Sequence, residues 1–542
     1  MDSFSFAAHA KKSEAEEIAY RRKTRLRIAI IVISTILLFL IFAGVSTMLI
    51  SNSISTKSGQ NMLNSTTFDS LKVVCSNTLY PDSCYSSISS ARPPNSTANN
   101  PVDIFKLSVQ VALAAVSEVA AFSDHLYTSS VNPAVKAALL DCKELFGSAA
   151  GHLNESLAIL HEAANANDIR TLLSGAVADL STCTEAATVN ATEYTSTSLA
   201  IATKYGSYIN LMKIKQFNNR KLLVASEELP PLFASPEGKL KANVTVAKDG
   251  TGNFQSIGAA MEKVPEKSSI PFVIYVKEGV YEEYVLVSSS KWNVVMLGDG
   301  MNRTIITGSR NRVDGSTAYK SATFTVEGRG FIAMDMSFRN TAGPEKSEAA
   351  ALLSKSDRSI FLRCSFQAFH NTLYPHSLRQ IYLNSDITGS IDFIIGDGAV
   401  VFQNCTIRPT QPISGQTNTI TAQARSDPNQ NTGTVIQSCV ISPFGDLSAP
   451  TTFLGRPGKN YSRTVVMMTE IGRVVKPEGW TEMIPGMMPP DSIFFGEYRN
   501  SGNGSDLAGR VGWRGYKPKM SDAEAEEFSV DSFIQGNRWI NV

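Results

Sequence analysis

Two short segments of the sequence combine residues that can carry out chemistry. The first, Gly389-Ser390-Ile391-Asp392-Phe393-Ile394-Ile395-Gly396, places one carboxylate among strand-forming apolar residues. An unpaired buried carboxylate is costly, and the second segment, Leu454-Gly455-Arg456-Pro457, offers a guanidinium as its partner. An aspartate held by an arginine stays ionised and oriented, which suits a nucleophile or a base. A purely structural buried ion pair is the alternative interpretation.

Further motifs follow one another in a fixed order through residues 240–542. They are Asp249-Gly250-Thr251-Gly252-Asn253-Phe254, Asn340-Thr341-Ala342-Gly343-Pro344, Thr372-Leu373-Tyr374, Thr421-Ala422-Gln423-Ala424-Arg425-Ser426-Asp427-Pro428-Asn429-Gln430, Tyr461-Ser462-Arg463-Thr464-Val465-Val466, Gly509-Arg510-Val511-Gly512-Trp513 and Phe533-Ile534-Gln535-Gly536. With these motifs the chain resembles the plant pectinesterases, the pectin methylesterases of the cell wall. It resembles the long type, which carries an N-terminal inhibitor-like domain.

The resemblance implies a catalytic groove with an aspartate nucleophile, a second aspartate as general acid and base, an orienting arginine and two oxyanion-binding glutamines. The nucleophile then falls on Asp392 and the arginine on Arg456. The general acid and base falls on Asn371, while the glutamine positions are His370 and Glu348. No metal or cofactor is implied, and the sequence has no CxxC or HxxxH spacing of the kind that binds metals.

These replacements predict an impaired or silent catalyst. An amide such as Asn371 has no titratable proton near neutral pH, so it cannot act as a general acid. A carboxylate at Glu348 would repel the oxyanion unless protonated. In the competing interpretation His370, whose pKa suits the task, supplies the missing proton, with Glu348 as its partner. A surface imidazole without a role is the third possibility for His370.

The resemblance also assigns substrate contacts to Phe393, Tyr374, Ala318 and Gly458. Ala318 stands where the family usually has a threonine, and Gly458 stands in place of a tryptophan that would stack on a sugar ring. We therefore expect weaker sugar contacts at these two positions than in the family.

The length, composition and charge of the chain limit which folds can position these residues. Its 542 residues suggest at least two domains. A hydrophobic content of 43% and a charged content of 18% are typical of globular proteins. The net charge of +1 and the lack of a dominant basic stripe argue against a general nucleic-acid binder.

The N-terminal segment predicts entry into the secretory pathway. Residues 1–27 form a basic tail that includes Arg21, Arg22 and Lys23, and residues 28–50 are almost entirely apolar, long enough to cross a membrane. The basic flank predicts a signal anchor with a cytosolic tail and a luminal remainder; a long cleaved signal peptide is the alternative. Nine Asn-x-Ser/Thr sequons agree with a luminal chain, although burial is expected for Asn404; they begin at Asn64, Asn95, Asn154, Asn190, Asn243, Asn302, Asn404, Asn460 and Asn503.

Residues 65–217 are predicted to be helical. Apolar residues recur at three- and four-residue steps over 102–126, 134–160, 168–186 and 198–217, and Pro101 suits a helix start. A four-helix bundle behind a short hairpin is the predicted fold, and the segment from Cys75 to Cys84 resembles the opening of pectinesterase-inhibitor domains. A generic helical pro region without inhibitory action is the alternative.

A linker over residues 218–242 follows. It contains the basic pair Arg220-Lys221 before Leu222-Leu223 and then becomes rich in proline, glutamate and serine. Exposed segments of this kind are cut easily, and the family resemblance implies removal of the pro region by a processing protease close to Leu223. An uncut surface loop is the alternative.

Residues 243–542 are predicted to form a right-handed parallel β-helix, an all-β solenoid. One apolar pattern recurs every 20 to 34 residues, at 331–338, 360–366, 381–387, 401–407 and 435–441. Apolar residues alternate within each copy, as in strands with one inward face. In such a solenoid, residues distant in sequence share one groove.

Seven cysteines fit an oxidising compartment. We expect disulfides Cys75–Cys84 and Cys142–Cys183 in the helical region. Cys405 and Cys439 occupy the same place in neighbouring repeats, so a third bridge is expected there, and Cys364 is expected to be buried and free.

These observations predict a secreted cell-wall ester hydrolase that acts on methylated polygalacturonate, or pectin, with impaired turnover. The alternative is a catalytically silent protein that binds pectin or inhibits a pectinesterase. The inhibitor-like domain then has another pectinesterase, or the chain's own catalytic domain, as its partner. The expected location is the cell wall or apoplast, with membrane anchoring through residues 28–50 before processing.

Overall fold

The computed structural model describes residues 65–93, 100–160, 166–183, 185–217, 241–445 and 451–540. The predicted membrane segment at 28–50 and the processing pair Arg220-Lys221 lie outside the described residues, so both remain predictions. Among the described residues, one helix is long and apolar enough to cross a membrane. It is Pro101–Ser129, whose buried Ile104, Phe105 and Val109 belong to the core of the helical region.

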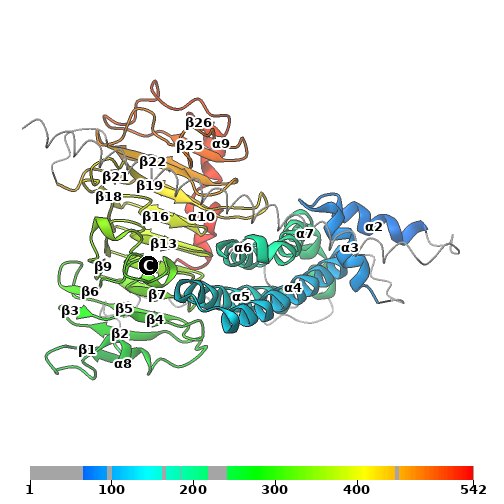
Figure 1. The fold of residues 1–542 in the computed structure, drawn as a ribbon, viewed down its shortest axis with the longest axis horizontal. Coiled ribbons are helices and arrows are strands. Elements are labelled where there is room, and N and C mark those ends of the chain that lie inside the picture. The colour runs from blue at the N-terminus through cyan, green and yellow to red at the C-terminus, as the bar shows by residue number, and fades with distance from the viewer. Residues whose placement is uncertain are drawn as a thin grey trace, which may run out of the picture. The chain divides into compact units, whose positions relative to one another are not determined.

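The described part of the helical region contains two short and four long helices (Figure 1). They are α2 (Ser65–Cys75), α3 (Pro81–Ala91), α4 (Pro101–Ser129), α5 (Pro133–Leu160), α6 (Ala166–Thr182) and α7 (Glu185–Phe217). Helix α4 starts as expected, with Pro101 in its first turn and the Asn100 side chain accepting a hydrogen bond from Asp103 N at 3.0 Å. The four long helices pack in a cycle, α4 against α5 and α7, and α6 against α5 and α7.

Helix α7 begins at Glu185, well before the predicted start at residue 198. The segment between is rich in serine and threonine, which lower the intrinsic preference for helix. Thr188, Ala191, Thr195 and Leu199 are nevertheless all buried, and they follow one another at three- and four-residue steps. Packing of this stripe overrides the local preference, which composition alone could not reveal.

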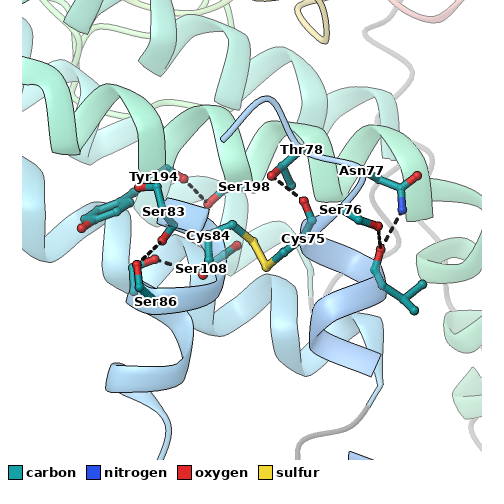
Figure 2. Close-up of a disulfide and its surroundings, with 12 residues drawn as sticks. Cys75, Ser76, Asn77, Thr78, Ser83, Cys84, Ser86, Ser108, Tyr194 and Ser198 are labelled. Carbon is teal, nitrogen blue, oxygen red and sulfur yellow. Dashed lines mark hydrogen bonds between the residues drawn. A yellow bond between two sulfur atoms is a disulfide. The ribbon is translucent and has the colours of Figure 1, made fainter. Parts of the chain in front are cut away.

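Two disulfides hold the helical region, with the predicted pairing. Cys75 at the end of α2 is bonded to Cys84 in α3, and Cys142 in α5 is bonded to Cys183 just after α6. Figure 2 shows the first bond closing the turn between α2 and α3. The Thr78 hydroxyl in that turn donates a hydrogen bond to Cys75 O at 2.8 Å, which satisfies a carbonyl at the helix end.

Residues from Val244 onward wind into a solenoid of three parallel sheets, as the repeats predicted (Figure 1). Sheet A contains β1 (Val244–Val246), β2 (Phe272–Val276), β5 (Val294–Leu297), β8 (Ile332–Met334), β11 (Ser359–Leu362), β14 (Arg379–Leu383), β17 (Ala399–Gln403), β20 (Gly433–Gln437), β23 (Arg463–Met467), β25 (Phe494–Tyr498) and β26 (Tyr516–Lys517). Sheet B contains β3 (Gly279–Glu282), β6 (Thr304–Gly308), β9 (Ser337–Asn340), β12 (Ser365–Gln367), β15 (Asp386–Gly389), β18 (Thr406–Pro409), β21 (Val440–Ile441) and β24 (Glu470–Ile471). Sheet C contains β4 (Val285–Val287), β7 (Phe324–Val326), β10 (Leu352–Ser354), β13 (Leu373–Pro375), β16 (Ile394–Gly396), β19 (Asn418–Gln423) and β22 (Thr452–Pro457).

Short helices lie between and beyond the strands. They are α8 (Ile257–Met261), α9 (Asp522–Glu526) and α10 (Val530–Ile534), with 3-10 turns at Tyr319–Ser321, Pro344–Lys346 and Gly536–Arg538. In Figure 1 the strand labels climb in chain order along the solenoid, from β1 beside α8 to β26 beside α9.

Each repeat seen in the sequence is a pair of short strands, one in sheet A and one in sheet B. The chain turns the corner between them at a single residue with left-handed backbone: Asp335, Arg363, Asn384, Asn404 and Ser438 have φ of 48° to 58°. Aromatic residues stack inside the solenoid at equal positions of successive coils, as with Phe361 and Tyr382, whose ring centroids lie 4.7 Å apart. Parallel, in-register pairing of consecutive coils produces this stacking.

The predicted Cys405–Cys439 disulfide is wrong, because both cysteines are free and buried, as is Cys364. In-register stacking does bring Cys405 N within 3.3 Å of Cys439 Sγ. However, each thiol donates to carbonyls near it: Cys405 Sγ to Tyr382 O at 3.3 Å and Cys439 Sγ to Gln437 O at 3.2 Å. Stacked residues point the same way, whereas a disulfide needs side chains that converge.

All seven sequon asparagines within the described residues are exposed, namely Asn154, Asn190, Asn243, Asn302, Asn404, Asn460 and Asn503. The expected burial of Asn404 is therefore wrong. Its left-handed corner position turns the side chain outward while Cys405 points into the core.

Candidate active site

The candidate site lies where the chain enters sheet C. Leu373 of β13 pairs with Ile394 of β16, so Asn371 and Asp392, each two residues earlier, occupy equal positions of adjacent coils. Both have left-handed backbone, with φ of 62° and 48°. Asparagine and aspartate adopt this conformation more readily than other side chains, so the corner favours one of these two residues whatever its chemical role.

Asp392 and Arg456 form the predicted pair, although 64 residues separate them. Arg456 Nε lies 2.9 Å from Asp392 Oδ1, and Arg456 Nη2 lies 2.5 Å from Oδ2, which makes the contact bidentate. The Asp392 side chain is 4% exposed and that of Arg456 28%, so the guanidinium borders solvent while the carboxylate lies beneath it. One carboxylate is thus held at the edge of sheet C in a fixed orientation.

Thr419 completes the support of Asp392, and the sequence analysis did not find it. Its hydroxyl accepts from Asp392 N at 2.8 Å and donates to Asp392 Oδ1 at 2.6 Å. The pairing of Ile394 with Thr421 places Thr419 level with Asp392 one coil further on. The distance in sequence between successive coils could have pointed to Thr419, but only if the pairing register of the coils were known.

Asn371 is buried, and its Oδ1 has no hydrogen-bond partner. Its backbone is fixed, since Asn371 N donates to Ile391 O at 3.2 Å. Buried polar atoms are nearly always paired in proteins. An unpaired acceptor one strand spacing from Asp392 therefore indicates a position for a ligand or water.

His370 directly precedes Asn371, and Glu348 lies beside His370 on the neighbouring coil. Glu348 and His370 form a β-bridge, and Ala349 N donates to His370 O at 3.1 Å. Glu348 Oε1 accepts from Arg312 Nη1 at 2.9 Å, and Oε2 accepts from Ser347 Oγ at 2.5 Å. Arg312 and Ser347 were also missed from the sequence; both lie on segments outside the recurrent strands.

These contacts shift two pKa values. Burial raises the pKa of Glu348, but the Ser347 hydroxyl, its own backbone N–H and the positive charges of Arg312 and His370 bring the pKa below its ordinary value. Burial lowers the pKa of His370, more strongly than the negative charges of Asp392 and Glu348 raise it. Glu348 is therefore ionised, and both of its carboxylate oxygens already accept hydrogen bonds. It has no hydrogen to donate to an oxyanion.

The four predicted substrate contacts differ in how deeply their side chains are buried. Phe393 is fully buried in the solenoid core, so its ring does not reach the surface and its assignment as a sugar contact is corrected. Tyr374, Ala318 and Gly458 are half-buried. A Cβ at Gly458 would lie 2.7 Å from Gln423 O on the neighbouring coil, so a side chain here requires the backbone to shift.

Within the described part of the chain, no group of three or more His, Cys, Asp or Glu side chains is placed to hold a metal ion. The arrangement offers instead an oriented carboxylate, an arginine, an imidazole and an amide. Such a set can perform nucleophilic attack on an ester carbonyl with acid–base assistance.

Comparison with known proteins decides the family. The family model described as Pectinesterase matches residues 243–537, and the model described as Plant invertase/pectin methylesterase inhibitor matches residues 69–201. The chain belongs to the pectinesterase family. Pectin methyl-ester hydrolysis is the activity that this family and fold support, and an inhibitor-type domain precedes the solenoid.

Curated relatives cover most of the pectinesterase chain. Pectinesterase 3 of Phaseolus vulgaris is 44% identical over 502 residues, covering 87% of this chain and 85% of the relative. Probable pectinesterase/pectinesterase inhibitor 46 of Arabidopsis thaliana is 40% identical over 553 residues, covering 97% and 96%. Among solved structures, the pectin methylesterase from carrot matches with 46% identity and a TM-score of 0.55, covering 56% of this chain and 96% of its own.

Proposed function

We propose that this pectinesterase hydrolyses methyl esters of polygalacturonate with Asp392 as the nucleophile and Arg456 as the orienting group. The bidentate contact between Asp392 and Arg456 at the entry to sheet C carries the proposal. Asp392 Oδ attacks the ester carbonyl, methanol leaves, and water then hydrolyses the acyl-enzyme. Thr419 holds the carboxylate from the neighbouring coil and leaves Arg456 as the group nearest to solvent.

Turnover is slow in this proposal because Asn371 cannot exchange a proton. A general acid and base typically contributes about 100- to 10,000-fold to a rate. The left-handed corner retains an asparagine at no structural cost, so the loss concerns chemistry and not folding. Glu348 adds a negative charge near the reaction, and Arg312 offsets it at 2.9 Å.

The remaining parts of the chain have proposed roles that rest on sequence. The segment at 28–50 delivers the protein to the secretory pathway and anchors it until a protease cuts near Arg220-Lys221. The solenoid then acts in the cell wall or apoplast on pectin. The helical region, as an inhibitor-type domain, engages a pectinesterase, either another pectinesterase or its own solenoid.

Methanol release from highly methylated pectin tests the proposal. The full chain would carry a specific protease site after Leu223, so that one preparation is assayed before and after cutting. We expect slow release that Asp392→Asn abolishes. Asp491→Asn is the matched control, because it removes a carboxylate from an exposed ion pair with Arg514.

Two results would contradict the proposal. Methanol release that persists in Asp392→Asn would show that Asp392 is not the nucleophile. Binding of pectin without any release, in the cut and uncut chain, would favour the non-catalytic alternative.

A further inference from the structure

Two neighbouring side chains beside Asp392 have unused hydrogen-bonding capacity. Asn371 Oδ1 is buried without a partner. Within the described residues, the imidazole of His370 has no hydrogen bond or ion pair. By contrast, Asp392 and Glu348 on either side have both carboxylate oxygens occupied. Preorganised but unsatisfied groups next to a held carboxylate are typical of a site that awaits a ligand.

The position of His370 is fixed by backbone bonds to the coils on both sides. Its carbonyl accepts from Ala349 N at 3.1 Å, and the following residue, Asn371, donates to Ile391 O at 3.2 Å. The charged groups that act on the imidazole are Asp392, Glu348, Arg456 and Arg312. These charges act on a half-buried ring that directly precedes Asn371, the residue level with Asp392.

The geometry points to His370 as the proton carrier of this esterase, with Asn371 Oδ1 beside it as an acceptor for water. This inference rests on the proposed function. The two adjacent positions have exchanged chemical types relative to what the family resemblance implies: the titratable group precedes the amide instead of following it. Turnover then persists in a chain whose acid position is an asparagine.

The proton balance closes with these residues alone. Protonated His370 and ionised Asp392 meet the methyl ester; Asp392 Oδ forms the new C–O bond, and the departing methoxide takes the imidazolium proton and leaves as methanol. Neutral His370 then takes a proton from water as the hydroxyl attacks the acyl-enzyme. The bond to Asp392 Oδ breaks, and the carboxylate and imidazolium are restored together.

The charge of Asp392 couples these steps. Burial lowers the pKa of His370, while the carboxylates of Asp392 and Glu348 raise it. When the Asp392 carboxylate becomes part of the mixed anhydride it loses its charge, so the imidazolium loses stabilisation at the moment its proton is needed. When the carboxylate returns, the imidazole regains its proton affinity. Methanol formation therefore requires the imidazolium and falls as pH rises through a pKa below the ordinary value of histidine.

Four chains in one assay test the role: the natural chain, His370→Gln, Asn371→Asp and the double variant. His370→Gln is expected to lower kcat for methanol release about 100-fold in the natural chain. In the Asn371→Asp background the same change is expected to cost less than about 3-fold, because the new carboxyl carries the proton. His125→Gln, on the exposed face of α4, is the matched control.

Each outcome has one meaning. Equal losses in both backgrounds, or no loss in the natural chain, would overturn the role of His370 while leaving Asp392 as nucleophile. A natural chain without methanol release would overturn the proposed function and this inference with it. A loss of rate confined to the asparagine background, together with loss of the fall in rate as pH rises, would establish His370 as the proton carrier.

A second measurement does not depend on activity. The chain has six histidines, so the imidazole C–H signals can be titrated by NMR and His370 assigned through His370→Gln. The pKa of His370 is expected to fall in Asp392→Asn and in Glu348→Gln, because each removes a charge that raises it. It is expected to be unchanged in Asp491→Asn. An unchanged titration in Asp392→Asn would show that the two side chains are not coupled and would refute the inference.

Discussion

Replacing Asn371 by aspartate should convert the slow esterase into a faster one. The new carboxyl would lie level with Asp392 on the adjacent coil, about 4.8 Å away in strand spacing. Two like charges at that separation repel by about 3 kcal/mol at an effective dielectric constant of about 20. This is enough to raise the pKa of the introduced acid from about 4 to about 6, where it can both donate and accept a proton.

The expected gain in kcat is about 100-fold, the lower end of the usual contribution of a general acid and base, because His370 already carries part of the proton transfer. The assay is methanol release across pH 4–8, in which Asn371→Asp should add a bell-shaped dependence. Asn384→Asp is the matched control: it makes the same change at another left-handed, exposed corner. A folded Asn371→Asp chain with the rate of the natural chain would refute the reasoning, since the missing proton would then not limit turnover.

Three further predictions concern stability. Burial raises the pKa of Asp397 to about 6, although Thr432, Gln430 and Gln423 donate hydrogen bonds to it; because the folded pKa exceeds the unfolded one, stability is full below pH ~4 and falls by about 3 kcal/mol as pH rises through 6. Thermal unfolding between pH 4 and 7 should show this fall in the natural chain, and an equal fall in Asp397→Asn would contradict it. Gly458→Ala should cost about 1–3 kcal/mol, because its Cβ would meet Gln423 O at 2.7 Å; an unchanged denaturant midpoint, with Gly512→Ala as the open-space control, would exclude this clash. Cys142→Ser with Cys183→Ser opens a 41-residue loop, which should cost about 4 kcal/mol; undiminished resistance of the helical region to proteolysis would speak against that value.

The solenoid could be predicted because its signal repeats along the chain. Each copy combines alternating apolar residues with a polar corner, and the corner tolerates only residues that accept left-handed backbone, such as Asn384 and Asn404. The start of α4 could also be predicted from the sequence, since Asn100 and Pro101 form a local helix start. The start of α7 was not, because its threonine-rich first half is held by packing that no local pattern reports.

Within the site, the sequence indicated which residues could do chemistry, but not which of them lie together in space. Asp392 and Arg456 stood out by type, but Thr419, Ser347 and Arg312 became visible only once the coils were in register. The Cys405–Cys439 disulfide shows the opposite error: the shared register was inferred, but register alone does not make side chains converge.

By itself the sequence determined which chemical groups are available: a lone aspartate, a distant arginine, and an asparagine and histidine side by side. These follow from covalent identity and need no fold. Only the tertiary structure decided that the Asp392 carboxylate is gripped by Arg456 and Thr419, that Phe393 faces the core, and that His370 and Asn371 keep unused hydrogen-bonding capacity beside it. Those relations depend on how coils of unequal length stack, a cooperative property of the whole solenoid that no single segment encodes.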